Sequence, residues 1–195
     1  MNNDAAPAVF LWRKLDSPGH DSCRFFSLAD GYRLLGAAVF LEAGQACQLQ
    51  YDVVADAGFR TTRAAVAGFV GNQPVDVRIS ATGQHWEVDG KRVPALAGCL
   101  DVDLGFTPAT NLLPLRRLAL HVGQEADAPA SYLAFPAMQF TLLPQHYHRL
   151  SGAYYDYLAP GYRGTLRVSA MGAVEHYPGL FELLWSLNAS GPIRR

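Results

Sequence analysis

The chain has 195 residues, of which 50% are hydrophobic and 17% are charged, and its formal net charge is -1. Ordinary domains carry about 25% charged residues, so the composition favours one domain, residues 1–195, with a large core, a lined cavity or a buried dimer interface. The near-neutral charge and the absence of a basic run exclude the clustered positive face that nucleic-acid binding needs.

The amino terminus predicts no export signal. Met1 to Asp4 lack the basic segment and apolar stretch of a signal peptide, and no apolar run approaches the length that crosses a bilayer. We therefore expect a cytoplasmic protein without a membrane span. Cys23, Cys47 and Cys99 lie far apart with no Cys-x-x-Cys spacing, so reduced packing thiols are expected.

Short apolar segments separated by turn residues predict a mainly antiparallel β fold. Asp30-Gly31 and Asp89-Gly90 lie between such segments, and Asp-Gly in this position is a strong hairpin signal. Two further strands are expected among the histidines and tyrosines that follow Pro144. The other expected strands, in chain order, are residues 8–13, 23–28, 33–41, 48–55, 61–67, 75–81, 84–88, 91–96, 115–122, 131–135, 164–169 and 173–177.

Two segments invite a helical interpretation. Residues 180–187 follow Pro178-Gly179, and Glu182 lies near the amino end, where the helix dipole favours an acid. A short helix that plugs or caps the sheet is therefore expected there. Residues 112–118 have helical propensity as well, but Pro114 favours a loop that leads into a strand.

The window from Gly98 to Leu118 concentrates the most unusual chemistry of the chain. Asp101 and Asp103 are two residues apart, so on a strand both carboxylates face one side. In an extended chain Arg116 and Arg117 point to opposite faces, so one arginine can meet the carboxylates while the other faces solvent, a second charge or a ligand. A structural ion pair that pins two strands explains the same residues.

Several short motifs occur along the chain in a characteristic order. They are Trp12, Tyr51-Asp52-Val53, Thr62-Arg63, Trp86 to Gly90, Gly98 to Leu104, Thr107 to Leu118, Gln145 to Leu150, and Val174 to Pro178. With these motifs the chain resembles the bacterial family of "Putative glycolipid-binding" domains, and the resemblance covers nearly the whole chain. It implies a spliced β-barrel, similar to periplasmic lipoprotein carriers, with a lipid- or glycolipid-sized cavity, and it implies no catalytic residue. We therefore expect an antiparallel spliced β-barrel or a strongly curved sheet, with one or two short helices.

Neither a metal site nor a cofactor site is expected. His146 and His148 share one face of a predicted strand, which suits two metal ligands, but a third ligand from Glu175 or His176 is not evident. No nucleophile elbow and no zinc-protease motif occurs. The tyrosines of the last third can cover apolar chains, stack on sugar faces or simply pair across strands.

Three functions remain open, and we prefer the first. A binding module would hold an amphipathic molecule or glycolipid, with its apolar part on Trp86 and Phe106. Its polar head would lie near Asn111, Arg116 and Arg117, and Tyr147 would add a further contact. Alternatively, an enzyme of glycolipid or related small-molecule metabolism would use Asp101 or Asp103 as acid or base. A homodimer that buries the apolar excess is the third possibility.

Overall fold

The computed structural model describes residues 6–83, 85–188 and 191–194. Met1 to Asp4 and Gln84, on which two of the expectations rest in part, lie outside these residues. The helical elements are η1 (Pro94–Leu96), η2 (Ala109–Asn111) and α1 (Leu112–Leu118). The strands are β1 (Ala8–Lys14), β2 (Gly19–Leu28), β3 (Gly31–Glu42), β4 (Gln45–Asp56), β5 (Thr61–Val70), β6 (Gln73–Thr82), β7 (His85–Val88), β8 (Lys91–Arg92), β9 (Asp101–Leu104), β10 (Glu125–Asp127), β11 (Ala130–Ala134), β12 (Gln139–Leu143), β13 (His146–Arg149), β14 (Tyr154–Ala159), β15 (Tyr162–Val168), β16 (Val174–Tyr177), β17 (Phe181–Asn188) and β18 (Gly191–Arg194).

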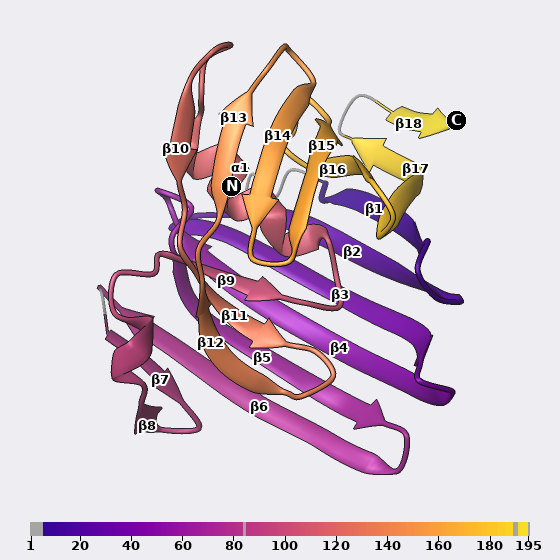
Figure 1. Ribbon diagram of the computed structural model, residues 1–195, viewed down its shortest axis with the longest axis vertical. Helices are drawn as coiled ribbons and strands as arrows, with labels where there is room; N and C mark the ends of the chain where they lie inside the picture. The colour runs from indigo at the N-terminus through magenta and orange to yellow at the C-terminus, as the bar shows by residue number, and fades with distance from the viewer. Residues whose placement is uncertain (1–5, 84, 189–190, 195) are drawn as a thin grey trace.

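Fifteen strands form one antiparallel sheet in the order β10-β13-β14-β15-β16-β17-β1-β2-β3-β4-β5-β6-β7-β8, with β18 beside β17. The predicted mainly β, antiparallel fold is therefore confirmed. Figure 1 shows that β13 to β15 run steeply across the direction of the long strands β2 to β6, so the sheet is strongly bent. Within the described residues, β10 and β8 do not pair, and the sheet is open and not closed into a barrel.

A second, three-stranded sheet lies against the long strands. Its order is β12-β11-β9, and β9 pairs with β11 in parallel. Thr61 at the start of β5 attaches it, because the Thr61 amide donates to the Leu100 carbonyl and the Val102 amide donates to the Thr61 hydroxyl. Figure 1 shows β9 and β11 in front of β3 to β5, so the large sheet is covered here.

The core fills the space between these layers. Side chains alternate along the long strands, and the inward positions of β4, from Cys47 to Ala55, are all buried. Burial of one large apolar side chain contributes about 1.5–3 kcal/mol, so the hydrophobic core dominates the stability. Trp12 illustrates the packing: its ring is buried, and its indole N–H donates to the Val174 carbonyl across 2.7 Å.

Two predicted elements are wrong. Residues 181–188 form β17, paired with β1, and not a helix. Phe181 and Leu183 are buried while Glu182 and Leu184 are partly exposed, which is the alternation of a strand. Residues 112–118 form α1, and neither the loop nor the strand expected at residues 115–122 exists. Pro114 is tolerated because it lies in the first helical turn, where the amide has no partner within the helix.

Two further details complete the comparison. The strand expected at residues 91–96 ends at Arg92 and is followed by η1, which Pro94 begins. The hairpin expected at Asp89-Gly90 is present between β7 and β8. In the part of the chain that the structure describes, no helix is long and apolar enough to cross a membrane.

Candidate functional site

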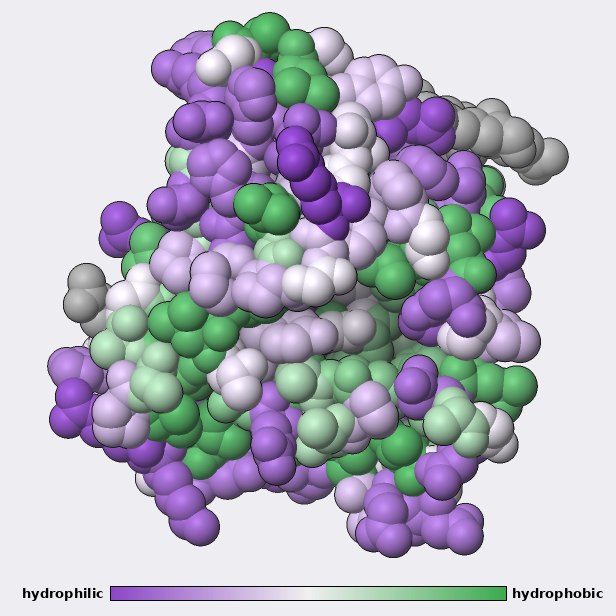
Figure 2. Space-filling view, in the orientation of Figure 1, coloured by the Kyte–Doolittle hydropathy of each residue, from purple (hydrophilic) through white to green (hydrophobic). Residues whose placement is uncertain are grey.

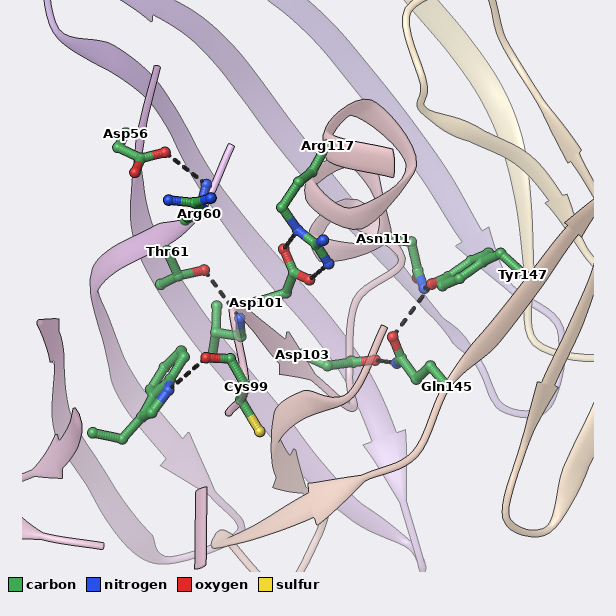
Figure 3. A network of polar contacts seen from close by, with 12 residues as sticks. Asp56, Arg60, Thr61, Cys99, Asp101, Asp103, Asn111, Arg117, Gln145 and Tyr147 are labelled. Carbon is green, nitrogen blue, oxygen red and sulfur yellow. Dashed lines mark hydrogen bonds and ion pairs between the residues drawn. The ribbon is translucent and has the colours of Figure 1, made fainter. Parts of the chain in front are cut away.

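Helix α1 is fixed to strand β9 by a buried ion pair. The Arg117 guanidinium contacts both carboxylate oxygens of Asp101, with an Nη2 to Oδ2 distance of 2.5 Å and an Nε to Oδ1 distance of 3.3 Å (Figure 3). Asp101 is 1% exposed. Desolvation raises the pKa of Asp101, and Arg117 opposes that rise. The two contacts form a bidentate ion pair that joins the helix to the strand.

Arg116 points elsewhere, because adjacent residues on a helix project in different directions. Its guanidinium lies 5.1 Å from the centroid of the Phe59 ring, and the side chain is exposed. Arg116 lines a surface hollow of about 340 Å³, and His121 and Arg149 line the same hollow. Arg149 donates to the carbonyls of Ser151, Leu120 and Gly152, so its guanidinium supports loops there.

Asp103 has a different neighbourhood from Asp101. It accepts a hydrogen bond from the Gln145 side-chain amide, and it forms no ion pair within the described residues. A chain of hydrogen bonds continues from Gln145, since the Tyr147 hydroxyl donates to the side-chain oxygen Oε1 of Gln145. The side-chain amide of Asn111 in turn donates to the Tyr147 hydroxyl across 3.0 Å (Figure 3). Burial raises the pKa of Asp103 to about 6, and the bond from Gln145 opposes the rise.

Asp103 lines a cavity of about 160 Å³ between the end of β9 and the turn from β14 to β15. Figure 2 shows the surface hollowed in this region, between the upper and lower parts of the molecule. Aromatic rings form much of the wall. The polar and aromatic lining residues include Asp103, Thr107, Asn111, Tyr132, Tyr157, Tyr162, Tyr177 and Phe181.

An apolar groove of about 710 Å³ lies next to this cavity. Ala159 and Pro160 line both volumes, so the two share a wall. Gln145 connects them as well, because it lines the groove and donates to Asp103 in the cavity. The remaining groove residues are Asp127, Pro129, Pro144, His146 and Leu158. A small cavity of mixed polar and aromatic lining and a larger, mainly apolar groove are thus adjacent.

Of the six predicted ligand-binding residues, Asn111 lines this cavity. Tyr147 is buried behind it and accepts a hydrogen bond from the Asn111 amide. Arg116 and Arg117 lie on α1, where Arg117 is held by Asp101. Trp86 and Phe106 are buried: the Trp86 indole donates to the Cys99 carbonyl across 3.0 Å, and the Phe106 ring packs beside Phe40, Tyr51 and Phe135. Neither of these two rings lines the cavity or the groove.

Sequence reasoning missed a buried carboxyl group on β2. Asp21 is 1% exposed and accepts hydrogen bonds from the hydroxyls of Thr107, at 2.5 Å, and Tyr51, at 3.1 and 3.2 Å. Desolvation raises the pKa of Asp21 to about 7. The alternation with Cys23 and Phe25 places Asp21 on the inward face of β2, and that pattern was the available signal.

Of the two histidines of β13, His146 is engaged by two acidic residues of the neighbouring strand β10. His146 contacts Asp127 through Nδ1 at 2.7 Å and Glu125 through Nε2 at 3.6 Å. The bond with Asp127 is the main reason why the pKa of His146 is raised. Across residues 6–83, 85–188 and 191–194, no group of three or more His, Cys, Asp or Glu side chains could hold a metal ion.

The fold and the cavity together define a bent, antiparallel β protein with an aromatic cavity that bears a carboxyl group. The family described as "Putative glycolipid-binding" matches residues 9–182, and the chain belongs to this family. A crystal structure of a DUF1089 family protein, PA1994 from Pseudomonas aeruginosa, is similar, with a TM-score of 0.74. The two sequences are 31% identical, and the match covers 83% of this chain and 90% of that chain. No curated protein matches.

Proposed function

We propose that the protein binds an amphipathic small molecule, such as a glycolipid, with its polar head in the cavity and its apolar chain along the groove. The observation that supports this most directly is the wall of Ala159 and Pro160, which lies between a cavity that bears polar groups and a mainly apolar groove. An amphipathic molecule that crosses this wall places each of its parts in a matching environment.

The two volumes differ in size as such a ligand requires. Small-molecule sites usually measure roughly 300–1,000 Å³, so a cavity of about 160 Å³ holds one small head group and not a whole lipid. Tyrosine rings offer flat faces to a sugar, and Asp103 and Asn111 offer hydrogen bonds to its hydroxyl groups. The groove, at about 710 Å³, is large enough for part of an acyl chain.

One observation favours an enzymatic function as a second candidate. Asp103 lines the cavity, and its pKa of about 6 suits a general acid or base near neutral pH. Glycoside cleavage ordinarily needs two carboxyl groups, and Asp101 is engaged by Arg117. Turnover of a glycolipid that is lost in Asp103→Asn, with ligand retention preserved, would support this candidate over simple binding.

The binding proposal is tested by native mass spectrometry of the purified protein, followed by lipid extraction. We expect one amphipathic molecule per chain in the wild type. Leu158→Ser removes an exposed apolar side chain from the groove, and we expect it to retain less ligand. Leu28→Ser is the matched control, since Leu28 is similarly exposed and lies outside the groove. Empty wild-type protein that also takes up no added amphiphile would contradict the proposal.

A further inference from the structure

The side chains that line the cavity carry one negative charge and no positive charge. Asp103 is the only acidic residue among those that line the cavity, and these lining residues include no lysine, arginine or histidine. On the same strand, Asp101 is neutralised by Arg117, whereas the partner of Asp103 is the neutral amide of Gln145. Within the described part of the chain, the cavity therefore holds a carboxylate whose charge no protein cation compensates.

Lys14 is a buried cation in this part of the molecule, and it is engaged elsewhere. Its ammonium nitrogen lies 3.1 Å from Asp16 and above the rings of Phe40 and Phe181, at 5.2 Å and 4.8 Å from their centroids. Phe181 lines the cavity, but Lys14 does not. Lys14 lowers the pKa of the buried Asp21, and its ammonium group forms an ion pair with Asp16 and not with Asp103.

Three tyrosine rings stand together in the cavity wall. Tyr157 and Tyr177 meet edge to face with centroids 5.7 Å apart, and Tyr162 and Tyr177 do so at 5.0 Å. Tyr157 and Tyr162 complete the group at 6.0 Å, and Tyr132 lines the cavity as well. The faces of aromatic rings carry negative electrostatic potential and attract cations, above all alkylated ammonium groups in aromatic cages.

We propose that the cavity selects a head group that carries an ammonium charge, such as an amino sugar or a choline-type group, over a neutral or anionic head. A cation there compensates Asp103 and contacts the faces of the tyrosine rings, whereas an anion meets an uncompensated carboxylate. This inference rests on the proposed function, which places a polar head in the cavity, and it adds the charge of that head.

Protonation of Asp103 provides an internal check. Because burial raises the pKa of Asp103 to about 6, the carboxyl group is mostly ionised at pH 7.5 and mostly neutral at pH 5. Cation binding should therefore weaken as the pH falls through about 6, while binding of a neutral head should change little.

The experiment uses amphiphiles that share a decyl chain and differ in the head: decyltrimethylammonium, decyl glucosaminide, decyl glucoside and decyl sulfate. Isothermal titration calorimetry below the micelle concentration gives their affinities at low salt and pH 6.8, where Asp103 is mostly ionised and the glucosaminide amine is mostly protonated. Circular dichroism confirms that the protein stays folded. We expect at least one of the two cations to bind about tenfold more tightly than the glucoside, and the sulfate to bind most weakly.

The outcomes separate the two proposals. Equal affinities, or tightest binding of decyl glucoside, would overturn the ammonium inference and leave the proposed function intact. Binding of none of the four amphiphiles would contradict the proposed function itself. If a cation binds tightest, the comparison of decyl glucosaminide with decyltrimethylammonium identifies the source of the charge as an amino sugar or a choline-type group.

Two sets of variants locate the selectivity. Asp103→Asn removes the charge but keeps an acceptor for Gln145, and we expect it to abolish the preference for cations. Asp76→Asn removes an exposed carboxylate of β6 that does not line the cavity, and the preference should persist. Tyr162→Leu should lose more cation affinity than Tyr162→Phe, because only the latter keeps the ring. An unchanged preference in Asp103→Asn would refute the inference.

Discussion

At the scale of single residues, two buried acids, Asp21 and Asp101, and the half-buried Asp103 have three different surroundings. Asp101 is neutralised by Arg117, Asp103 is bonded to an amide and lines the cavity, and Asp21 is bonded to two hydroxyl groups in the core. A buried charge without a cation is costly, so such a carboxyl group keeps its proton to a higher pH. The surroundings of each acid, and not its residue type, decide its role.

Asp21 should make stability depend on pH in a definite direction. Its pKa is about 7 in the folded protein and 3.8 as an ordinary value, so between these values the folded protein holds a proton that the unfolded chain has released. The unfolding free energy contributed by this group therefore falls as pH rises from about 4 to about 7, by about 1.4 kcal/mol per pKa unit at most.

Asp21→Asn should remove this part of the pH dependence. The amide cannot ionise, and it can still form hydrogen bonds with the hydroxyl groups of Thr107 and Tyr51. Urea unfolding between pH 4 and pH 8 measures the effect, with Asp76→Asn as a control for the loss of one carboxyl group at an exposed site. Parallel pH profiles in the wild type and Asp21→Asn would show that Asp21 is ionised in the folded protein.

At the scale of elements, the sequence predicts the long strands well and the short segments poorly. Strands β2 to β6 are each ten or twelve residues long and contain the expected segments, and Asp30-Gly31 forms the expected turn between β2 and β3. Residues 181–188 and 112–118 are each about two helical turns long, too short for periodicity to separate helix from strand. Pairing with β1 decides the first segment, and the bond from Arg117 to Asp101 fixes the second.

The β3–β4 pair holds the ring that supports Asp21. Gly36 faces Tyr51 across the two strands, and a Cβ atom at Gly36 would lie 2.2 Å from Tyr51 Cζ. We expect Gly36→Ala to displace the tyrosine ring and to lower the unfolding free energy by about 1–3 kcal/mol. Chemical denaturation measures the loss.

Gly152→Ala is the matched control for this prediction. No atom lies within 4 Å of the position that its Cβ would occupy, so we expect a change of less than about 0.5 kcal/mol. Equal stability of Gly36→Ala and Gly152→Ala would mean that the Tyr51 ring moves aside without cost.

At the scale of the whole molecule, the cavity unites segments that are far apart in the sequence. Asp103 comes from β9, Tyr132 from β11, Tyr157 and Tyr162 from the β14–β15 hairpin, and Tyr177 from β16. The sequence singled out the acid and several of these tyrosines as candidates. Their meeting depends on the bend of the large sheet and on the small sheet against it (Figure 1), and no local pattern encodes either.

Strands of the large sheet and of the small sheet both line the cavity. A ligand bound there should therefore stabilise the fold as a whole. A ligand present at 100 times its dissociation constant, and bound only by the folded state, adds about 2.7 kcal/mol. For a domain of this size that corresponds to a rise in Tm of roughly 5–10 °C. Differential scanning fluorimetry with the tightest decyl amphiphile measures the rise, and hydrogen exchange should slow in both β9 and the β14–β15 hairpin. A rise in Tm with protection confined to a distant strand, such as β6, would place the ligand outside the cavity.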